Sequence, residues 1–112
     1  MSSLEWKFFV IWNNDIKDLP FHQELAIIPN RKFRYDFAWP DLKVVLELDG
    51  GIWSGGGHTT GRGKTRDCEK DWLAFVNGWT VIRWTPNMIT SKNIRTLADK
   101  LSCKKILQST AT

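Results

Sequence analysis

An aromatic side chain at every second position from residue 33 to residue 39 constrains the fold of this chain most. Alternation with a period of two is typical of a half-buried strand, and residues 44–49 form a second apolar strand segment after a turn at Pro40. With a four-residue loop over residues 40–43, one face of the hairpin is apolar throughout. That face pairs Tyr35 with Leu48, Phe37 with Leu46, and Trp39 with Val44. A slip of one residue would spoil both faces, so the pattern predicts this register.

The same register gathers acidic residues on the opposite face of the hairpin. Asp36 stands opposite Glu47, and a preceding strand over residues 23–28 with a three-residue turn places Glu24 beside Asp36. Directly opposed residues have Cβ atoms roughly 5 Å apart, so these carboxylates repel one another unless something compensates. A divalent cation such as Mg²⁺, which binds carboxylate oxygens, is one explanation. The alternative is an ordinary polar face whose acids are neutralised by Arg34 and Lys32.

Helices and a fourth strand are predicted around this three-stranded unit. Helical spacing of apolar residues indicates helices over residues 4–12, 66–77 and 92–104, and the pattern predicts a strand over residues 80–84. The first of these segments contains an apolar run that also suits a strand. We therefore expect an α/β fold with a mixed sheet: a three-strand antiparallel meander, a crossover helix, a fourth strand, and flanking helices.

One face of the helix predicted over residues 66–77 is apolar and is expected to be buried. That face holds Cys68, Trp72, Phe75 and Val76. The two cysteines, Cys68 and Cys103, form no C-x-x-C pair, and we expect both to be buried free thiols. A zinc site that combines them with His22 and His58 is the alternative, although the spacings match no common ligand pattern.

The length of 112 residues suits one domain with a single core. Hydrophobic residues make up 42% of the chain and charged residues 25%, proportions that are ordinary for a soluble globular protein. No apolar run approaches the ~20 residues that a membrane span needs. The first residues have no positive region followed by an apolar stretch, so we expect no secretory signal, no membrane partner and a cytoplasmic location.

A net charge of +4 and clustered basic residues point to a polyanionic partner. The expected phosphate contacts are Arg34 from one cluster and three residues around a glycine-rich segment, namely Arg62, Lys64 and Arg66. The glycines of residues 50–64 let the main chain approach a ligand closely. Trp53 in that segment can wedge between base pairs or pack as a lid on the core, and both interpretations stay open.

The segments from Arg34 to Pro40 and from Val45 to Gly51 resemble the PD-(D/E)XK nuclease superfamily. Within it, the chain looks most like the small endonuclease-domain branch related to very short patch repair endonucleases. His58, a helix and residues 78–84 continue the likeness, which covers roughly residues 20–90. It implies a restriction-endonuclease-like core, a single nuclease domain over residues 1–112, and hydrolysis of DNA phosphodiesters with Mg²⁺, for which Mn²⁺ substitutes.

The resemblance also implies roles for individual residues. Asp36 and Glu47 match the metal ligands, with the backbone carbonyl of Leu48 as a third, and Glu24 matches an acid beside the metal. The chain departs from the pattern at one position, because the lysine expected two residues after the glutamate is here Asp49.

Three residues are candidates for the role of that lysine. Asp49 projects to the same face as Glu47 and can position water or a second metal. His58 can act as an acid or base, because the ordinary pKa of histidine is near neutrality. Lys70 can reach the site from the helix over residues 66–77. For His58 and Lys70 the alternative is a plain surface residue, and for Asp49 it is an ion pair with Arg34 on the opposite strand.

Three functions remain open from the sequence. The first is an endonuclease acting on duplex, mismatched or branched DNA that it recognises by shape, alone, as a homodimer, or within a larger DNA-processing complex. The second is a DNA-binding module of the same fold that has lost catalysis. The third is a metal-binding accessory protein that acts on a protein partner. The acids predicted on one face favour the first.

Overall fold

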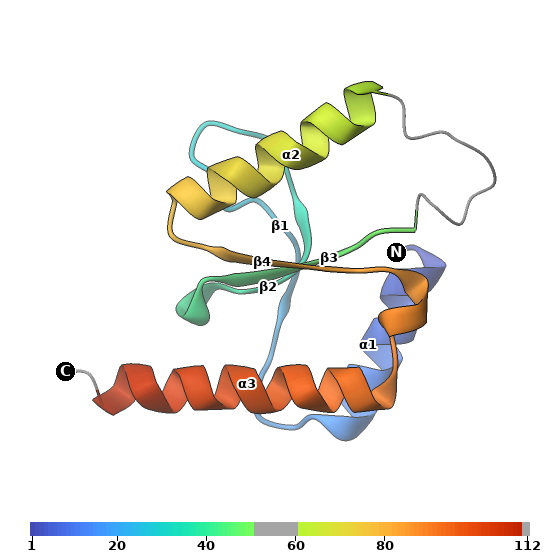
Figure 1. Ribbon diagram of the computed structural model, residues 1–112. Coiled ribbons are helices and arrows are strands. Elements are labelled where there is room, and N and C mark those ends of the chain that lie inside the picture. Colours follow the sequence, from blue (N-terminus) through green and yellow to red (C-terminus); the bar gives the residue numbers. More distant parts are fainter. Residues whose placement is uncertain (51–60, 111–112) are drawn as a thin grey trace.

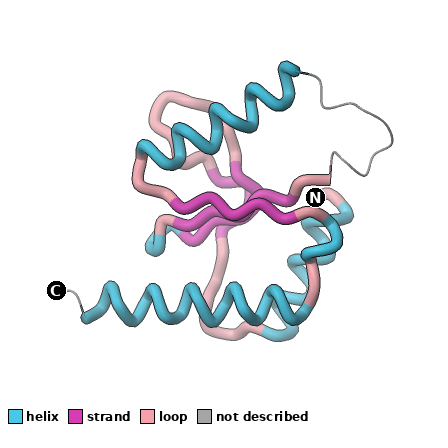
Figure 2. Tube along the Cα trace, viewed as in Figure 1, coloured by secondary structure: helices cyan, strands magenta, loops and turns pink. Residues whose placement is uncertain are grey.

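The computed structural model describes residues 1–50 and 61–110. A four-stranded sheet lies between helices, with α2 on one face and α1 and α3 on the other (Figures 1 and 2). The elements in chain order are α1 (Ser3–Asp15), β1 (His22–Leu25), β2 (Tyr35–Trp39), the 3-10 helix η1 (Pro40–Leu42), β3 (Val44–Leu48), α2 (Gly61–Val76), β4 (Thr80–Trp84), the 3-10 helix η3 (Pro86–Met88) and α3 (Ser91–Thr110). The predicted α/β class with a mixed sheet and flanking helices is confirmed.

The order of strands in the sheet is β1-β2-β3-β4. The first two pairings are antiparallel, and β3 and β4 are parallel neighbours joined through α2. Phe37 pairs with Leu46, as the four-residue loop requires. Leu25 pairs with Tyr35, which is the register expected for the first strand. β1 is nevertheless shorter than the predicted 23–28 strand, and Glu24 within it has a positive φ of 50°.

The N-terminal segment is helical, so its interpretation as a strand is wrong. Ser2 caps α1, because its side chain accepts a hydrogen bond from the backbone N–H of Glu5. Phe8 and Trp12, one helical turn apart, are buried and pack against the sheet residues Phe37 and Trp39. This aromatic cluster forms the larger core, between the sheet and α1 and α3.

A smaller core lies between the sheet and α2, and it contains Tyr35. The prediction that Tyr35 shares a face with Phe37 is therefore wrong. The paired part of β2 and β3 ends at Phe37 and Leu46, and the alternation of faces is interrupted at the next residue, Asp36. There the backbone N–H donates to the side chain of Glu47 in β3 and not to a backbone carbonyl.

The outer face of α2 carries the apolar residues that were expected to be buried. Trp72, Phe75 and Val76 are 62%, 70% and 58% exposed. Among the residues of α2 whose burial is described, Lys70 and Ala74 are the buried ones, because α2 packs through the small side chain of Ala74 and through polar bonds made by Lys70.

The expectation of two buried thiols is also wrong, because Cys68 and Cys103 are both exposed. Within the described residues, neither joins His22 in a group suited to zinc. No helix in the described part of the chain has the length and apolarity needed to cross a membrane.

Candidate active site

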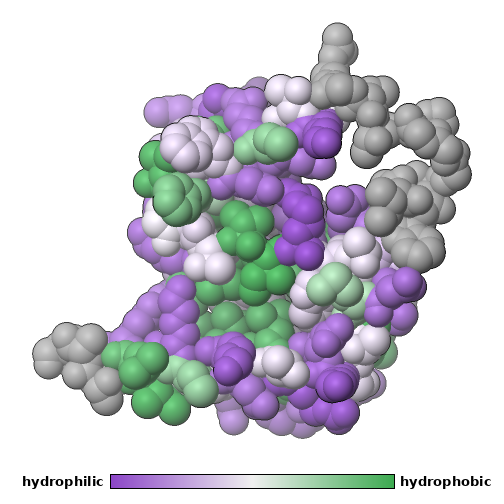
Figure 3. Space-filling view, viewed as in Figure 1, coloured by the Kyte–Doolittle hydropathy of each residue, from purple (hydrophilic) through white to green (hydrophobic). Residues whose placement is uncertain are grey.

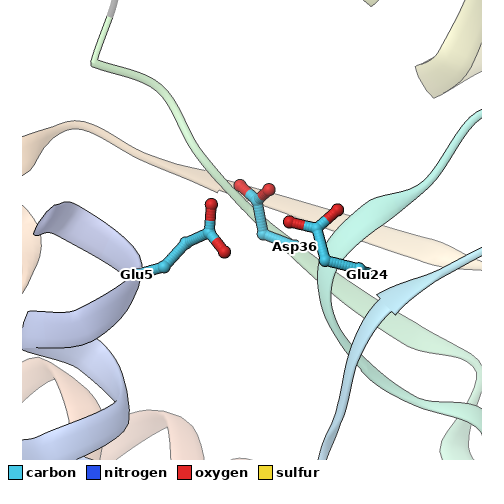
Figure 4. Close-up of side chains that lie close together, drawn as sticks. All are labelled: Glu5, Glu24 and Asp36. Atoms are coloured by element: carbon cyan, nitrogen blue, oxygen red, sulfur yellow. The ribbon is translucent and has the colours of Figure 1, made fainter. Parts of the chain in front are cut away.

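Acidic side chains from three separate elements meet at one end of the sheet. Glu5 comes from the first turn of α1, Glu24 from β1 and Asp36 from β2. Figure 4 shows the three carboxyl groups facing a common space, and each offers an oxygen within 4.8 Å of the other two. The sequence predicted the approach of Glu24 to Asp36, and the structure adds Glu5.

Asp36 and β3 are connected by a reciprocal pair of hydrogen bonds. The backbone N–H of Leu48 donates to Asp36 Oδ2 at 2.8 Å, and the backbone N–H of Asp36 donates to Glu47 Oε1 at 2.7 Å. Glu47 therefore lies beside Asp36, as predicted, but its side chain is directed to the backbone of Asp36 and toward α2.

Two carboxyl groups of the cluster, those of Asp36 and Glu24, resist ionisation. Burial, and then the charge of Glu47, raise the pKa of Asp36 to about 7, despite the opposing bond from Leu48. Burial and the neighbouring carboxylate of Glu5 raise the pKa of Glu24 as well. Crowded acids of this kind are common at functional sites, because a cation or a proton is needed to offset their repulsion.

Lys70 supplies a positive charge at the same place. Its Nζ lies 2.8 Å from Glu47 Oε2 and donates a second bond of 2.8 Å to the carbonyl oxygen of Arg34. Lys70 and Glu47 are 7% and 8% exposed, so this ion pair is buried. The Nζ atom also lies 4.5 Å from the centre of the Tyr35 ring. Of the three residues considered for the role of the family lysine, Lys70 is placed against the glutamate.

Tyr35 fixes the part of α2 that carries Lys70. The hydroxyl group of Tyr35 donates to the backbone carbonyl of Lys70 at 2.8 Å, and burial raises the pKa of this hydroxyl to about 12. The ring and the helix are thus held together at the residue whose ammonium group reaches Glu47. Tyr35 of β2 thus helps to position Lys70.

Glu5 is the residue that sequence reasoning missed. Ser2 caps the start of α1: the backbone N–H of Glu5 donates to Ser2 Oγ, and Ser2 Oγ donates to Glu5 Oε1, both at 3.2 Å. The Ser-x-x-Glu spacing signals a helix start, but it says nothing of the distance to Glu24. The segment after β3 passes close to the start of α1, since a Cβ atom on Gly50 would lie 2.8 Å from Leu4 Cδ1.

The other predicted site residues lie around this centre or outside the described residues. Asp49 is half-buried just after β3, and its backbone N–H donates to the carbonyl of Trp84 at 2.7 Å. Arg34 is exposed beside the centre. The exposed Lys64 and Arg66, and the backbone of Arg62, belong to α2. His58 and Trp53 lie outside the described residues.

A search of solved structures relates the fold of this chain to a known catalytic domain. The chain is similar to the "Homing Endonuclease I-Bth0305I Catalytic Domain", with a TM-score of 0.57 and 15% identity over 96% of this chain and 92% of that one. No protein-family model matches the chain, and no curated protein matches it. At this identity the likeness concerns the fold, and the chain therefore has the fold of an endonuclease catalytic domain.

Proposed function

We propose that the protein is a metal-dependent DNA endonuclease that hydrolyses phosphodiester bonds around Asp36. The observation that carries the proposal is the cluster of Glu5, Glu24 and Asp36, with the Glu47–Lys70 ion pair beside it. The solved domain of the same fold is named as a homing endonuclease catalytic domain, which supports the reaction class.

The donor atoms of the cluster fit a hard divalent cation. Carboxylate and carbonyl oxygens are the ligands that Mg²⁺ and Mn²⁺ prefer. Asp36 and Glu47 with the carbonyl of Leu48 are the ligands expected from the sequence, and Glu5 and Glu24 add oxygens close to Asp36. Both oxygens of Glu47 already accept hydrogen bonds, so Glu5, Glu24 and Asp36 provide most of the oxygen atoms that can bind a cation.

Residues of the chain beside the cation are proposed to stabilise charge and to accept a proton. A bound divalent cation would supply Lewis-acid polarisation of the phosphate and a more acidic water. Lys70 holds a positive charge at Glu47 Oε2, where it can stabilise negative charge that develops on the phosphate. Glu24, with its raised pKa and exposed side chain, can accept a proton from the attacking water.

The DNA surface is proposed to include Arg34 and the start of α2, where Lys64 and Arg66 are exposed. These residues can pair with phosphates, which positions the backbone without reading the bases. A domain this small has little surface for base readout, so the substrate is proposed to be recognised by the shape of duplex, mismatched or branched DNA.

Cleavage assays on supercoiled, mismatched and four-way-junction DNA with Mg²⁺, Mn²⁺ or EDTA test the proposal. Asp36→Asn should lower the single-turnover rate at least 10²-fold, because loss of a ligand weakens the charge stabilisation that the cation provides. Asp41→Asn, an exposed carboxyl in η1, is the matched control and should cleave normally. DNA binding in EDTA without cleavage under any metal would instead favour the inactive DNA-binding module.

A further inference from the structure

In the part of the chain that the structure describes, no strand pairs with the outer edge of β4. The backbone N–H of Thr80 and the carbonyl of Trp84 bond toward β3, so by alternation the N–H and C=O groups of Val81 and Arg83 point away from the sheet. Edge strands are usually blunted by irregular backbone, proline or lysine. The opposite edge, β1, has four residues and a left-handed Glu24, whereas β4 has five regular residues and neither proline nor lysine.

Apolar grooves flank this edge on both faces of the sheet. On the α2 side, a groove of about 510 Å³ is lined by Phe75, Trp79 and Val81, with polar groups at its margin. On the α3 side, a smaller groove of about 260 Å³ is lined mainly by apolar residues, including Ile82 and Met88. Figure 3 shows hydrophobic side chains gathered between α2 and α3 on this face of the molecule.

The outer face of α2 extends the apolar surface. Trp72 and Phe75 stack with ring centres 6.0 Å apart, although both are more than half exposed. Phe75 also lines the groove beside Val81, so the helix face and the strand edge form one surface. Large exposed aromatic side chains next to unpaired backbone groups are characteristic of an interface.

We propose that this surface binds a second copy of the chain, with β4 pairing antiparallel to its symmetry mate about a two-fold axis at Ile82. The outward N–H and C=O groups of one copy can bond only to outward groups of the other copy. Val81 must therefore pair with Val81 or Arg83 of the second copy, or with a residue beyond the strand. With the axis at Ile82, Val81 of each copy pairs with Arg83 of the other, so the two N–H and two C=O groups that each copy directs outward are all bonded. A two-fold axis at any other residue would leave part of β4 without a partner strand.

Charge complementarity also favours a second copy as the occupant. The charged residues that line the groove on the α2 side are Asp71 and Arg83, which form an ion pair of 2.7 Å. Two copies therefore present equal numbers of opposite charges to each other there, in a chain whose net charge is +4.

The dimer would contain a continuous eight-stranded sheet with both α2 helices on one side. Glu24 and Asp36 lie toward the other edge and stay accessible, so this proposal does not depend on the nuclease function.

Light scattering and sedimentation of the full chain test the association. The wild-type protein should dimerise below about 100 μM, and Phe75→Lys should weaken dimerisation about tenfold or more by placing a charge in the apolar contact. Ile106→Lys is the matched control, since Ile106 is 64% exposed and lines neither groove, and it should leave dimerisation unchanged. A monomeric wild-type chain, or equal effects of the two variants, would overturn the proposal.

A cysteine placed on the axis tests the register. In a Cys68→Ser, Cys103→Ser background, Ile82→Cys should form a disulfide-linked dimer on mild oxidation, because residues facing each other in a non-hydrogen-bonded pair have Cα atoms about 4.5 Å apart. Arg83→Cys should cross-link much more slowly, since its own symmetry mate lies diagonally across the pair. Faster cross-linking at position 83 than at position 82 would show that the pairing is wrong.

Discussion

Burial and the negative charge of Glu47 both disfavour ionisation of the Asp36 carboxyl group, and they raise its pKa to about 7. The folded protein therefore binds a proton at this site between pH 4 and pH 7 that the unfolded chain, with an aspartate pKa of 3.8, has released. Since the folded state binds more protons in this window, its free energy of unfolding should fall as the pH rises through it.

Urea denaturation in EDTA at several pH values measures this effect. We expect the wild-type chain to lose stability between pH 4 and pH 7, and Asp36→Asn to lose less, because asparagine can still accept the Leu48 bond without ionising. Parallel curves for the two proteins would show that another group carries the pH dependence.

Glu5 is expected to contribute to cation binding through its position beside Asp36. Glu5→Gln keeps the size of the side chain and an oxygen that can accept the Ser2 bond, but it removes one negative charge from the cluster. The affinity for Mg²⁺ or Mn²⁺, measured by calorimetric titration, should drop about 10-fold to 100-fold. Asp41→Asn serves again as the control, and an unchanged affinity in Glu5→Gln would remove Glu5 from the site.

At the scale of elements, the Lys70–Glu47 ion pair joins α2 to β3. Removing one partner leaves a buried charge without compensation, so Lys70→Met should lower the free energy of unfolding by about 3–5 kcal/mol. Combining it with Glu47→Gln should cost less than the sum of the two single changes, because the double variant leaves no buried charge. A double-mutant cycle from urea denaturation measures this coupling, and strictly additive losses would mean that the pair is not coupled.

The sequence predicted the strands β2 and β3, because their relative position follows from strand pairing. The alternation around Phe37 specified the register of β2 with β3, since a slip would have exposed one apolar face. Helix α2 was oriented wrongly because its face was chosen by apolarity, whereas Lys70 is buried through polar partners. Glu5 could not be placed, because its distance to Asp36 depends on how α1 packs, and no local pattern encodes that packing.

At the scale of the whole molecule, the surplus of positive charge should govern the affinity for DNA. Replacing Arg62, Lys64 and Arg66 together with alanine removes three side chains that are candidates for binding phosphates at the start of α2. The slope of log affinity against log salt should then decrease in magnitude by roughly 0.9 for each phosphate that is no longer neutralised. Replacing Lys100, Lys104 and Lys105 on α3 makes a control of equal charge. An unchanged slope in the variant of α2 would place the DNA elsewhere.

The carboxyl groups of the site come from α1, β1, β2 and β3, so they are neighbours only after the chain has folded. A cation held by this cluster would have no equivalent binding site in the unfolded chain. By mass action, a cation concentration of 100 times its dissociation constant would add about 2.7 kcal/mol to the free energy of unfolding. The supply of divalent metal would thus set the fraction of molecules that survive proteolysis, as well as the rate at which they act.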